Sequence, residues 1–496
     1  MTICFFLALL LPFCESWNFL FVHSYAGGSH QTVSVFTANL LASRNHSVTY
    51  ISTNAPTALH PSIKVIWLKE SDGYLNHFLK EIINKALPTG KAVPPSMFTG
   101  NIGPFSGPLI KKLSKTLFHN KEVSKLMHSG EKFDAVCTWM MEIPGYALAH
   151  RLGIEKVIIT NPAPGLMPYT TDKMSMSSAI FKKDRHILIG FVEGSMLARA
   201  KNVALSNMFG LFIYLVNRFY FDPSLIEDVP DFPGLQSMTE KVKLTLLHHH
   251  PLVDAPYELG PSVISVGGVM CPSYDANEIS PDIHSFLLGT TGFIVFSLGS
   301  HLGEYTEKQQ NILISAFSEL PYQVIWKNKH KVSNLPQNVM TVSWLPQAML
   351  LQHPMIKVFI THGGYASKME GFCGGVPMVV LPCFAADQHL TATQLFERGL
   401  ALKIDSLLEL TSEDIVSKVL EADQGPYRAR MQDLQRQILL TRVTPGQVMG
   451  YIDVVVSGGS LGPDPLMWHQ YLYYDLILAP IGVILATKWF VRWCRN

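Results

Sequence analysis

The chain is 496 residues long, too long for one hydrophobic core, so two large domains are expected. Hydrophobic residues make up 48% of the sequence and charged residues only 16%, and the formal net charge is +1. With no basic block, these values argue against a nucleic-acid-binding protein and favour a globular protein associated with a membrane.

Both ends of the chain have the composition of targeting segments. Residues 1–16 contain the apolar run Ile3 to Phe13 followed by small residues, which predicts a signal peptide cleaved after residue 16. Residues 472–491 are predicted to form a single transmembrane helix, with residues 492–496 as a cytosolic tail. The alternative is an amphipathic helix on the membrane surface. With an anchor, everything before it lies in a lumen.

Four cysteines remain when the signal and the tail are set aside, namely Cys137, Cys271, Cys373 and Cys383. Their spacings contain no C-x-x-C pair, so neither a metal site nor a disulfide framework follows from them. Asn45 begins the one glycosylation sequon, Asn-His-Ser, and a modified Asn45 fits a lumenal chain.

The first half begins with a strand, a helix and a second strand. Residues 19–23 form a short apolar run, residues 24–30 a Gly-rich turn, residues 32–41 have helical apolar spacing, and residues 48–51 form the second strand. A similar unit recurs at residues 133–160. Such units place their loops at the carboxyl ends of parallel strands, where open sheets bind ligands.

Residues 164–221 are rich in Met, Phe and Leu and are predicted to be helices lining an apolar pocket, with ordinary core packing as the alternative. The second half is more regular. Its strand-like runs are residues 293–297, 323–326, 340–342, 358–361, 378–381 and 400–404. Strands that alternate with helices predict a parallel sheet covered on both faces.

The chain therefore divides into two doubly wound α/β domains that face each other across a cleft, with a boundary near Val266. The predicted order is one α/β domain over residues 17–265, a second over residues 266–440, and a connecting segment over residues 441–471 that leads to the membrane helix.

The densest set of chemical groups lies in the second domain. His362 ends a strand, and Gly363 and Gly364 open the next helix without side chains in the way, so backbone N–H groups and the helix dipole can receive a diphosphate. Glu370 follows about two turns later near the same face, where a carboxylate can accept hydrogen bonds from two ribose hydroxyls.

Residues on either side of this helix complete a nucleotide-sugar site. Trp344 offers a flat apolar face for a base, and Gln347 offers an amide one turn later. Asp387 and Gln388 follow a strand and are suited to sugar hydroxyls. The other common nucleotide-sugar-binding fold holds Mg²⁺ or Mn²⁺ with an Asp-x-Asp triplet. No such triplet is present in the sequence, so no metal or cofactor is expected. The run His248 to His250 is a weak metal candidate, because adjacent histidines in a strand point to alternating faces.

This constellation resembles the signature of the UDP-glycosyltransferases, which include glucuronosyltransferases and ecdysteroid glucosyltransferases. Order and spacing agree over about 45 residues apart from one extra Ala in residues 384–387, and residues 27–30, 266–268 and 296–300 extend the resemblance. The resemblance implies a GT-B fold, with residues 17–265 as the acceptor-binding domain and residues 266–440 as the UDP-sugar-binding domain. It also implies that Trp344 stacks on uracil, that Gln347 and Glu370 contact the nucleoside, that His362 and Ser300 touch the diphosphate, and that Asp387 and Gln388 bind the donor sugar.

His30 is the predicted catalytic base. It lies at the start of a helix whose dipole disfavours imidazolium, which keeps the ring neutral and basic at pH 7. The resemblance also makes this histidine the general base. Relatives place an acid at the position of Trp139, so Glu142, three residues later, is the predicted substitute; Asp134 is expected at the far end of its strand.

A second departure is Ala366, where many relatives have Asn, although Ser367 and backbone amides remain for phosphate. The leading hypothesis is inverting, metal-independent transfer of glucose or glucuronic acid to a small lipophilic acceptor in the endoplasmic reticulum lumen. Residence there is implied by the resemblance. The alternatives are an impaired relative that binds UDP-sugar or a lipophile without turnover, and a UDP-sugar epimerase.

Overall fold

A computed structural model describes most of the two predicted domains. The described residues are 16–24, 31–53, 59–69, 107–161, 218–219, 222–225, 227–254, 259–299, 305–330, 332–383, 386–405, 407, 410–462 and 487–488. The predicted base His30, the predicted diphosphate ligand Ser300, the region 164–221 apart from residues 218–219, and the predicted signal peptide before residue 16 lie outside them.

The first half of the chain folds around a seven-stranded parallel sheet in the order β3-β2-β1-β4-β5-β6-β7. Its strands are β1 (Asn18–His23), β2 (Ser47–Ser52), β3 (Lys64–Trp67), β4 (Ala135–Thr138), β5 (Val157–Asn161), β6 (Val242–Leu247) and β7 (Val263–Ser265). The strand order reverses at β1, which pairs with both β2 and β4. Loops that leave β1 and β4 diverge at such a point and leave room for a ligand.

The helices of this half are α2 (Thr32–Ala42), α5 (Gly107–His119), α6 (Lys121–His128), α7 (Ile143–Arg151), α10 (Asp222–Leu225) and α11 (Leu235–Glu240). Both strand–helix–strand units predicted from the sequence are confirmed, as β1–α2–β2 and β4–α7–β5. The edge strand β3 and the strands β6 and β7 were not predicted.

The second half folds around a six-stranded parallel sheet in the order β10-β9-β8-β11-β12-β13. The strands are β8 (Phe293–Ser297), β9 (Gln323–Lys327), β10 (Val339–Val342), β11 (Ile356–Thr361), β12 (Met378–Val380) and β13 (Ala401–Lys403). All six predicted strands are confirmed to within a few residues. The order reverses at β8, which pairs with both β9 and β11, so the loops after β8 and β11 meet at the switch point.

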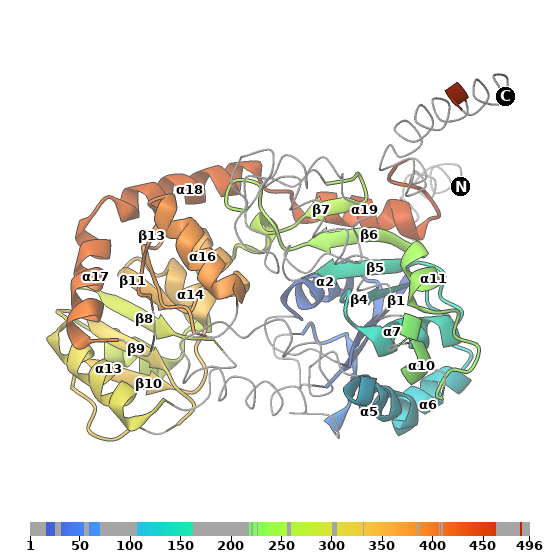
Figure 1. The fold of residues 1–496 in the computed structure, drawn as a ribbon, viewed down its shortest axis with the longest axis horizontal. Coiled ribbons are helices and arrows are strands. Elements are labelled where there is room, and N and C mark those ends of the chain that lie inside the picture. The colour runs from blue at the N-terminus through green and yellow to red at the C-terminus, as the bar shows by residue number, and fades with distance from the viewer. Residues whose placement is uncertain are drawn as a thin grey trace, which may run out of the picture.

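Helices cover both faces of this sheet, as the alternating pattern predicts. They are α12 (Pro281–Leu287), α13 (Glu307–Glu319), α14 (Gln347–Gln352), α15 (Tyr365–Gly374), α16 (Ala386–Glu397), α17 (Ser412–Gln424) and α18 (Tyr427–Thr441), with the short 3₁₀ turns η7 (Gly268–Met270) and η8 (Ala276–Glu278) before them. Figure 1 shows the two sheets in separate halves of the molecule, β8 to β13 on the left and β1 to β7 on the right.

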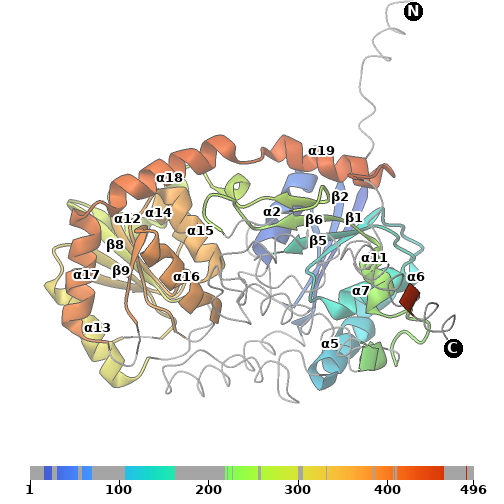
Figure 2. The same ribbon diagram turned by 45° about the horizontal axis from the view of Figure 1, so that its top comes forward.

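The final described helix, α19 (Pro445–Val456), returns to the first sheet. Figure 2 shows α18 and α19 running in succession along the top, α18 over the second sheet and α19 over the first. Val448 and Ile452 of α19 are fully buried in the core that contains Phe19 and Phe21 of β1. The predicted connecting segment 441–471 therefore contributes a helix to the core of the first half.

Cys271 and Cys373 form a disulfide, with Cα atoms 5.2 Å apart. The bond joins the segment after η7 to the end of α15, across a sequence separation of 102 residues. Cys137 and Cys383 are free and buried. The sequence analysis identified no disulfide, because spacing alone does not show that these two cysteines meet.

None of the helices in the described part of the chain is long and apolar enough to cross a bilayer. The predicted membrane helix, residues 472–491, lies outside that part except for residues 487–488. It stays a prediction.

Candidate active site

The centre of the predicted donor site is the His362 ring, which is packed against glycine backbone. A Cβ atom at Gly364 would lie 2.3 Å from His362 Nε2, and one at Gly299 would lie 2.8 Å from the same nitrogen. Gly299 also has a φ of +86°, which L side chains rarely adopt. Only glycine at both positions admits the ring, which is thereby fixed beside the amino-terminal end of α15.

The electrostatics of this corner suit an anion. Burial, followed by the charge of Lys327, lowers the pKa of His362 to about 4, so the imidazole is neutral at pH 7. His362 Nδ1 is buried and has no hydrogen-bond partner among the described residues. Gly364 is the N-cap of α15 and has no side chain to cap it, and the dipole at this end of the helix favours an anion such as a phosphate.

The amide of Gln347, at the start of α14, contacts two predicted site residues on α15. Gln347 Nε2 donates to Glu370 Oε2 at 2.5 Å and lies 3.2 Å from Ser367 Oγ. Gln347, Ser367 and Glu370 are therefore one contiguous polar cluster, although their positions in the sequence span more than twenty residues.

The Glu370 carboxyl group has an unusually high pKa. Burial raises its pKa to about 7, and the hydrogen bond from Gln347 and the positive charge of Lys327 offset only part of the effect. A half-buried carboxyl group of this kind gains hydrogen-bond donors when a ligand with neighbouring hydroxyls binds.

Trp344 lies after β10 with 67% of its surface exposed. A large aromatic ring so exposed is a ready stacking surface for a planar ligand. The Lys327 ammonium lies 5.6 Å from the centroid of this ring. Burial, followed by the nearby charge of Lys329, lowers the pKa of Lys327. Lys327 thus lies near the Trp344 ring and close enough to Glu370 and His362 for its charge to affect their pKa values. It was not among the site residues predicted from the sequence.

Asp387 and Gln388 lie in the first turn of α16. Gln388 is buried, and its side-chain oxygen accepts a hydrogen bond from the Cys383 backbone N–H at 3.0 Å. Asp387 is half-buried, and burial raises its pKa. The two residues therefore differ in their surroundings: the Gln388 oxygen is used in a hydrogen bond within the protein, whereas Asp387 is partly exposed.

On the first sheet, Glu142 is fully buried and accepts a hydrogen bond from the Ser24 hydroxyl at the end of β1. Glu142 thus lies at the carboxyl edge of the sheet, beside the last described residue before the loop that carries His30. Trp139, which the resemblance places at the position of the relatives' acid, is 2% exposed and belongs to the hydrophobic core. Asp134 lies at the opposite end, where it accepts a hydrogen bond from the Asn18 backbone, as predicted.

His23, the last residue of β1, was not among the site residues predicted from the sequence. It is fully buried, and within the described residues neither ring nitrogen has a hydrogen-bond partner. Its ring stacks on Tyr50, with centroids 5.4 Å apart. Burial lowers the pKa of His23 to about 3, so the ring is neutral. A polar residue ending an apolar strand was the only signal in the sequence.

The three adjacent histidines have separate surroundings. The His248 ring packs edge-on against Tyr365, His249 Nδ1 lies 2.8 Å from Ser265 Oγ, and His250 Nε2 lies 3.3 Å from Thr441 Oγ1. Over the described ranges, no group of three His, Cys, Asp or Glu side chains is arranged to hold a metal ion.

Asn45 lies in the exposed turn between α2 and β2 with a φ of 65°. Its backbone oxygen accepts a hydrogen bond from Ser16 Oγ, and its side chain is open to modification. Glycosylation there stays a prediction.

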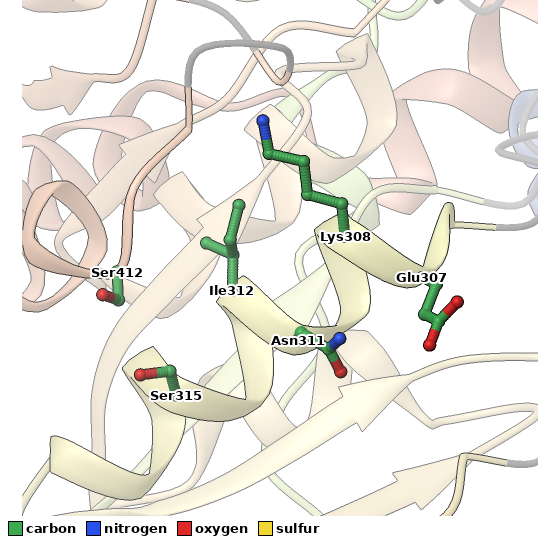
Figure 3. A pocket seen from close by; sticks show the side chains of 6 residues that line it. All are labelled: Glu307, Lys308, Asn311, Ile312, Ser315 and Ser412. Carbon is green, nitrogen blue, oxygen red and sulfur yellow. The ribbon is translucent and has the colours of Figure 1, made fainter.

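A shallow surface hollow lies elsewhere, between α13 and the start of α17 (Figure 3). It is lined by Glu307, Lys308, Asn311, Ile312, Ser315 and Ser412. None of the predicted site residues is among them, so the hollow has no connection with the chemistry described above.

Comparison with known proteins decides the family. The sequence profile described as UDP-glucoronosyl and UDP-glucosyl transferase matches residues 29–436, well over half of the chain. The chain belongs to this family. It is therefore a member of the UDP-dependent glycosyltransferases, as the resemblance in its second half predicts.

Relatives within the family are similar over long stretches. Rabbit (Oryctolagus cuniculus) UDP-glucuronosyltransferase 1A4 is 26% identical over 392 residues, which cover 76% of this chain and 71% of the relative. Human UDP-glucuronosyltransferase 1A8 is 25% identical over 512 residues, covering 99% of this chain and 93% of the relative.

Solved structures of glycosyltransferases show the same fold. The glycotransferase of kitacinnamycin superimposes with a TM-score of 0.57 at 18% identity, covering 88% of this chain and 98% of that one. Phytolacca americana UGT2 superimposes with a TM-score of 0.55 at 18% identity, covering 89% and 99%. The two parallel Rossmann-like sheets of this UDP-glycosyltransferase therefore form the predicted GT-B fold.

Proposed function

We propose that this family member transfers a hexose from a UDP-sugar to a hydroxyl group of a small lipophilic acceptor, with inversion and without a metal ion. The observation that carries the proposal is the cluster of Gln347, Ser367 and Glu370 beside the exposed ring of Trp344 and the glycine-bound ring of His362. A stacking surface, a ribose-sized hydrogen-bonding pair and an anion-binding helix terminus then follow one another in the order of base, ribose and diphosphate.

In this proposal each part of the donor meets a group suited to it. Uracil stacks on Trp344, the ribose hydroxyls donate to Glu370, and the diphosphate accepts hydrogen bonds from His362 and from the first-turn amides of α15. Because His362 is neutral, it stabilises charge on the leaving UDP as a hydrogen-bond donor rather than by giving up a proton. Ser300 is the further diphosphate contact implied by the resemblance.

The transfer is a single displacement. His30 takes the proton from the acceptor hydroxyl, that oxygen attacks the anomeric carbon, and the bond from this carbon to the β-phosphate oxygen breaks as UDP leaves. Glu142 is the proposed partner that stabilises the resulting imidazolium. The hydrogen bond from Ser24 supports this role, because it holds the buried carboxyl group at the sheet edge next to a residue only six positions before His30 in the sequence.

The donor sugar is proposed to be glucose or glucuronic acid, bound by Asp387 and Gln388. Curated relatives are named UDP-glucuronosyltransferases, and the Phytolacca americana structure holds UDP-2fluoro-glucose together with pterostilbene. These names support a UDP-hexose as donor and a small organic molecule as acceptor.

We also propose that the protein is anchored in the endoplasmic reticulum membrane by residues 472–491, with both α/β domains in the lumen. The predicted signal peptide and the exposed sequon at Asn45 support this location. So does the Cys271–Cys373 disulfide, because such bonds persist in oxidising compartments.

The test uses the full chain in microsomes, with UDP-glucose and UDP-glucuronate offered against a panel of phenols and sterols. We expect a glycosylated product from the wild type and none from His30→Ala, while UDP binding by His30→Ala persists. His128→Ala, which removes an exposed histidine on α6, is the matched control and keeps full activity. Undiminished turnover by His30→Ala would contradict the assignment of the base.

One observation favours a second candidate. Trp139 is buried in the core at the position where relatives carry the acid, so the protein is alternatively a binder of UDP-sugar or of a lipophilic ligand without turnover. Any glycosylated product formed by the wild type and lost in His30→Ala removes this candidate.

A further inference from the structure

The segment after β6 carries a buried acid that none of the steps above uses. Asp254 is 4% exposed at its side chain and follows Val253, which packs into the core of the second sheet. The segment therefore begins on the first sheet and ends in the core of the second, and Asp254 lies where it meets α15.

Asp254 accepts three hydrogen bonds. Lys368 Nζ donates at 2.7 Å, the Tyr365 hydroxyl donates to the other carboxylate oxygen, and the His250 backbone N–H donates at 2.9 Å. The Lys368 ammonium also lies 4.1 Å from the centroid of the Tyr365 ring. The carboxylate thus joins the first two turns of α15 to the segment that crosses between the sheets.

The charges around Asp254 agree with an ionised carboxylate. Burial by itself raises its pKa, but Lys368, His249 and the hydrogen bonds from Lys368 and Tyr365 together lower it below its ordinary value. Lys368 is 5% exposed, so each charge is buried and depends on the other.

The arrangement of α15 connects this contact to the donor site. Tyr365 and Lys368 are three residues apart and share one face of the helix, while Ser367 and Glu370 share the neighbouring face that meets Gln347. Gly364, the N-cap of α15, has no side chain, so it makes no capping hydrogen bond that would hold the first turn of the helix. The far end of α15 is held separately by the disulfide at Cys373.

We propose that Asp254 is a positioning residue for the diphosphate part of the donor, which acts by holding the first turn of α15 through Lys368 and Tyr365. The inference rests on the proposed function, because it takes the amino-terminal amides of α15 as the diphosphate site. The proposed nucleoside contacts are Trp344, Gln347 and Glu370, and Glu370 lies beyond the first turn of α15, towards the end held by the disulfide, so nucleoside binding does not depend on the position of the first turn.

The two ligands UDP and uridine separate this role from a general structural one. In Asp254→Asn, we expect UDP to bind about tenfold or more weakly, because the helix terminus that receives the diphosphate is no longer held in place, while uridine affinity changes less than about twofold. The double variant Asp254→Asn with Lys368→Met removes both buried charges and shows the same selective loss of UDP binding. Tyr365→Phe removes one hydrogen bond and gives a smaller loss of the same kind.

The experiment is calorimetric titration of the full chain in detergent with UDP and with uridine, with thermal unfolding recorded for each variant. Asp405→Asn, which removes an exposed carboxylate 2.9 Å from Lys403 Nζ, is the matched control and leaves both affinities unchanged. Two results would overturn the role of Asp254 and leave the proposed function standing. One is an equal loss of UDP and uridine affinity, and the other is unchanged UDP affinity in folded Asp254→Asn and Tyr365→Phe. If the wild type binds no UDP, the proposed function fails together with it.

Discussion

Gln347 Nε2 lies 2.5 Å from Glu370 Oε2, so α14 and α15 present an amide and a carboxyl group as one hydrogen-bonded pair. The pair has a consequence for ligand binding because the Glu370 carboxyl group is protonated in part of the molecules near neutral pH. A ligand that donates hydroxyl groups to this pair favours the carboxylate, so its affinity depends on pH.

The first prediction concerns this pH dependence. With a pKa of about 7 for Glu370, uridine affinity should fall by about tenfold between pH 8 and pH 6, because ligand binding to the carboxylate competes with protonation. Uridine is used because it has no phosphate that titrates in this range. Calorimetric titrations of Glu370→Gln should show weaker binding at pH 8 and no change with pH. A pH profile in Glu370→Gln that matches the wild type would contradict this assignment.

The same pKa shift affects stability with a defined sign. The folded protein keeps a proton on Glu370 up to about pH 7, whereas the ordinary pKa is 4.5. Glu370 therefore contributes stability at low pH that is lost as the pH rises through 7. In Glu370→Gln this contribution disappears, and the midpoint of thermal unfolding should fall less between pH 5 and pH 8 than it does in the wild type.

The second prediction concerns Trp344. Loss of the stacking surface in Trp344→Ala should weaken UDP binding by about 1–3 kcal/mol, or at least about fivefold, without a large change in stability, because the ring is exposed. Equilibrium binding of UDP measures the effect. Trp67→Ala removes a partly exposed tryptophan from the edge strand β3 and should leave affinity unchanged. Equal UDP affinity in Trp344→Ala and the wild type would place the base elsewhere.

How much of this site could be predicted from the sequence depends on how local its determinants are. Trp344, His362 and Asp387 each follow a strand, and the carboxyl ends of parallel strands lie at one edge of a sheet, so the strand predictions alone place all three at the same edge. The six strands of the second half are short, buried and apolar, which makes them visible as runs in the sequence. The fold of the second half was therefore predictable.

The remaining features depend on contacts between distant residues. Asp254 and Lys368 are 114 residues apart, and Cys271 and Cys373 are 102 apart, so no periodicity links them. Helix α19 begins with a Thr444 capping box and has buried apolar positions, yet its partner is the strand β1 near the opposite end of the chain. Burial of Trp139 beside an ionisable Glu142 likewise follows from packing rather than from local spacing.

The third prediction concerns the Cys271–Cys373 disulfide. Replacing both cysteines by Ser should lower the free energy of unfolding by about 2–4 kcal/mol, because the bond closes a long loop of the unfolded chain. Reductant should lower the unfolding midpoint of the wild type and leave that of the double variant unchanged. Cys383→Ala, a buried free cysteine, is the control and should keep the sensitivity to reductant. A wild type indifferent to reductant would show that the bond is not formed.

The fourth prediction concerns His23, which is buried without a hydrogen-bond partner among the described residues. Because its folded pKa, about 3, is below the ordinary 6.5, the unfolded chain takes up a proton as the pH falls below 6.5. His23 therefore contributes stability at neutral pH that is lost on acidification. At pH 5 the loss is about 2 kcal/mol relative to pH 7.5.

His23→Phe tests this expectation, because phenylalanine keeps the stacking on Tyr50 and removes the two unpaired nitrogens. The variant should be more stable than the wild type by about 1–2 kcal/mol at neutral pH, and by more at pH 5. Denaturant unfolding at pH 7.5 and pH 5 measures both differences, and His128→Phe, at an exposed position on α6, should change neither. An equal loss of stability on acidification in His23→Phe and the wild type would show that His23 is not buried as a neutral ring.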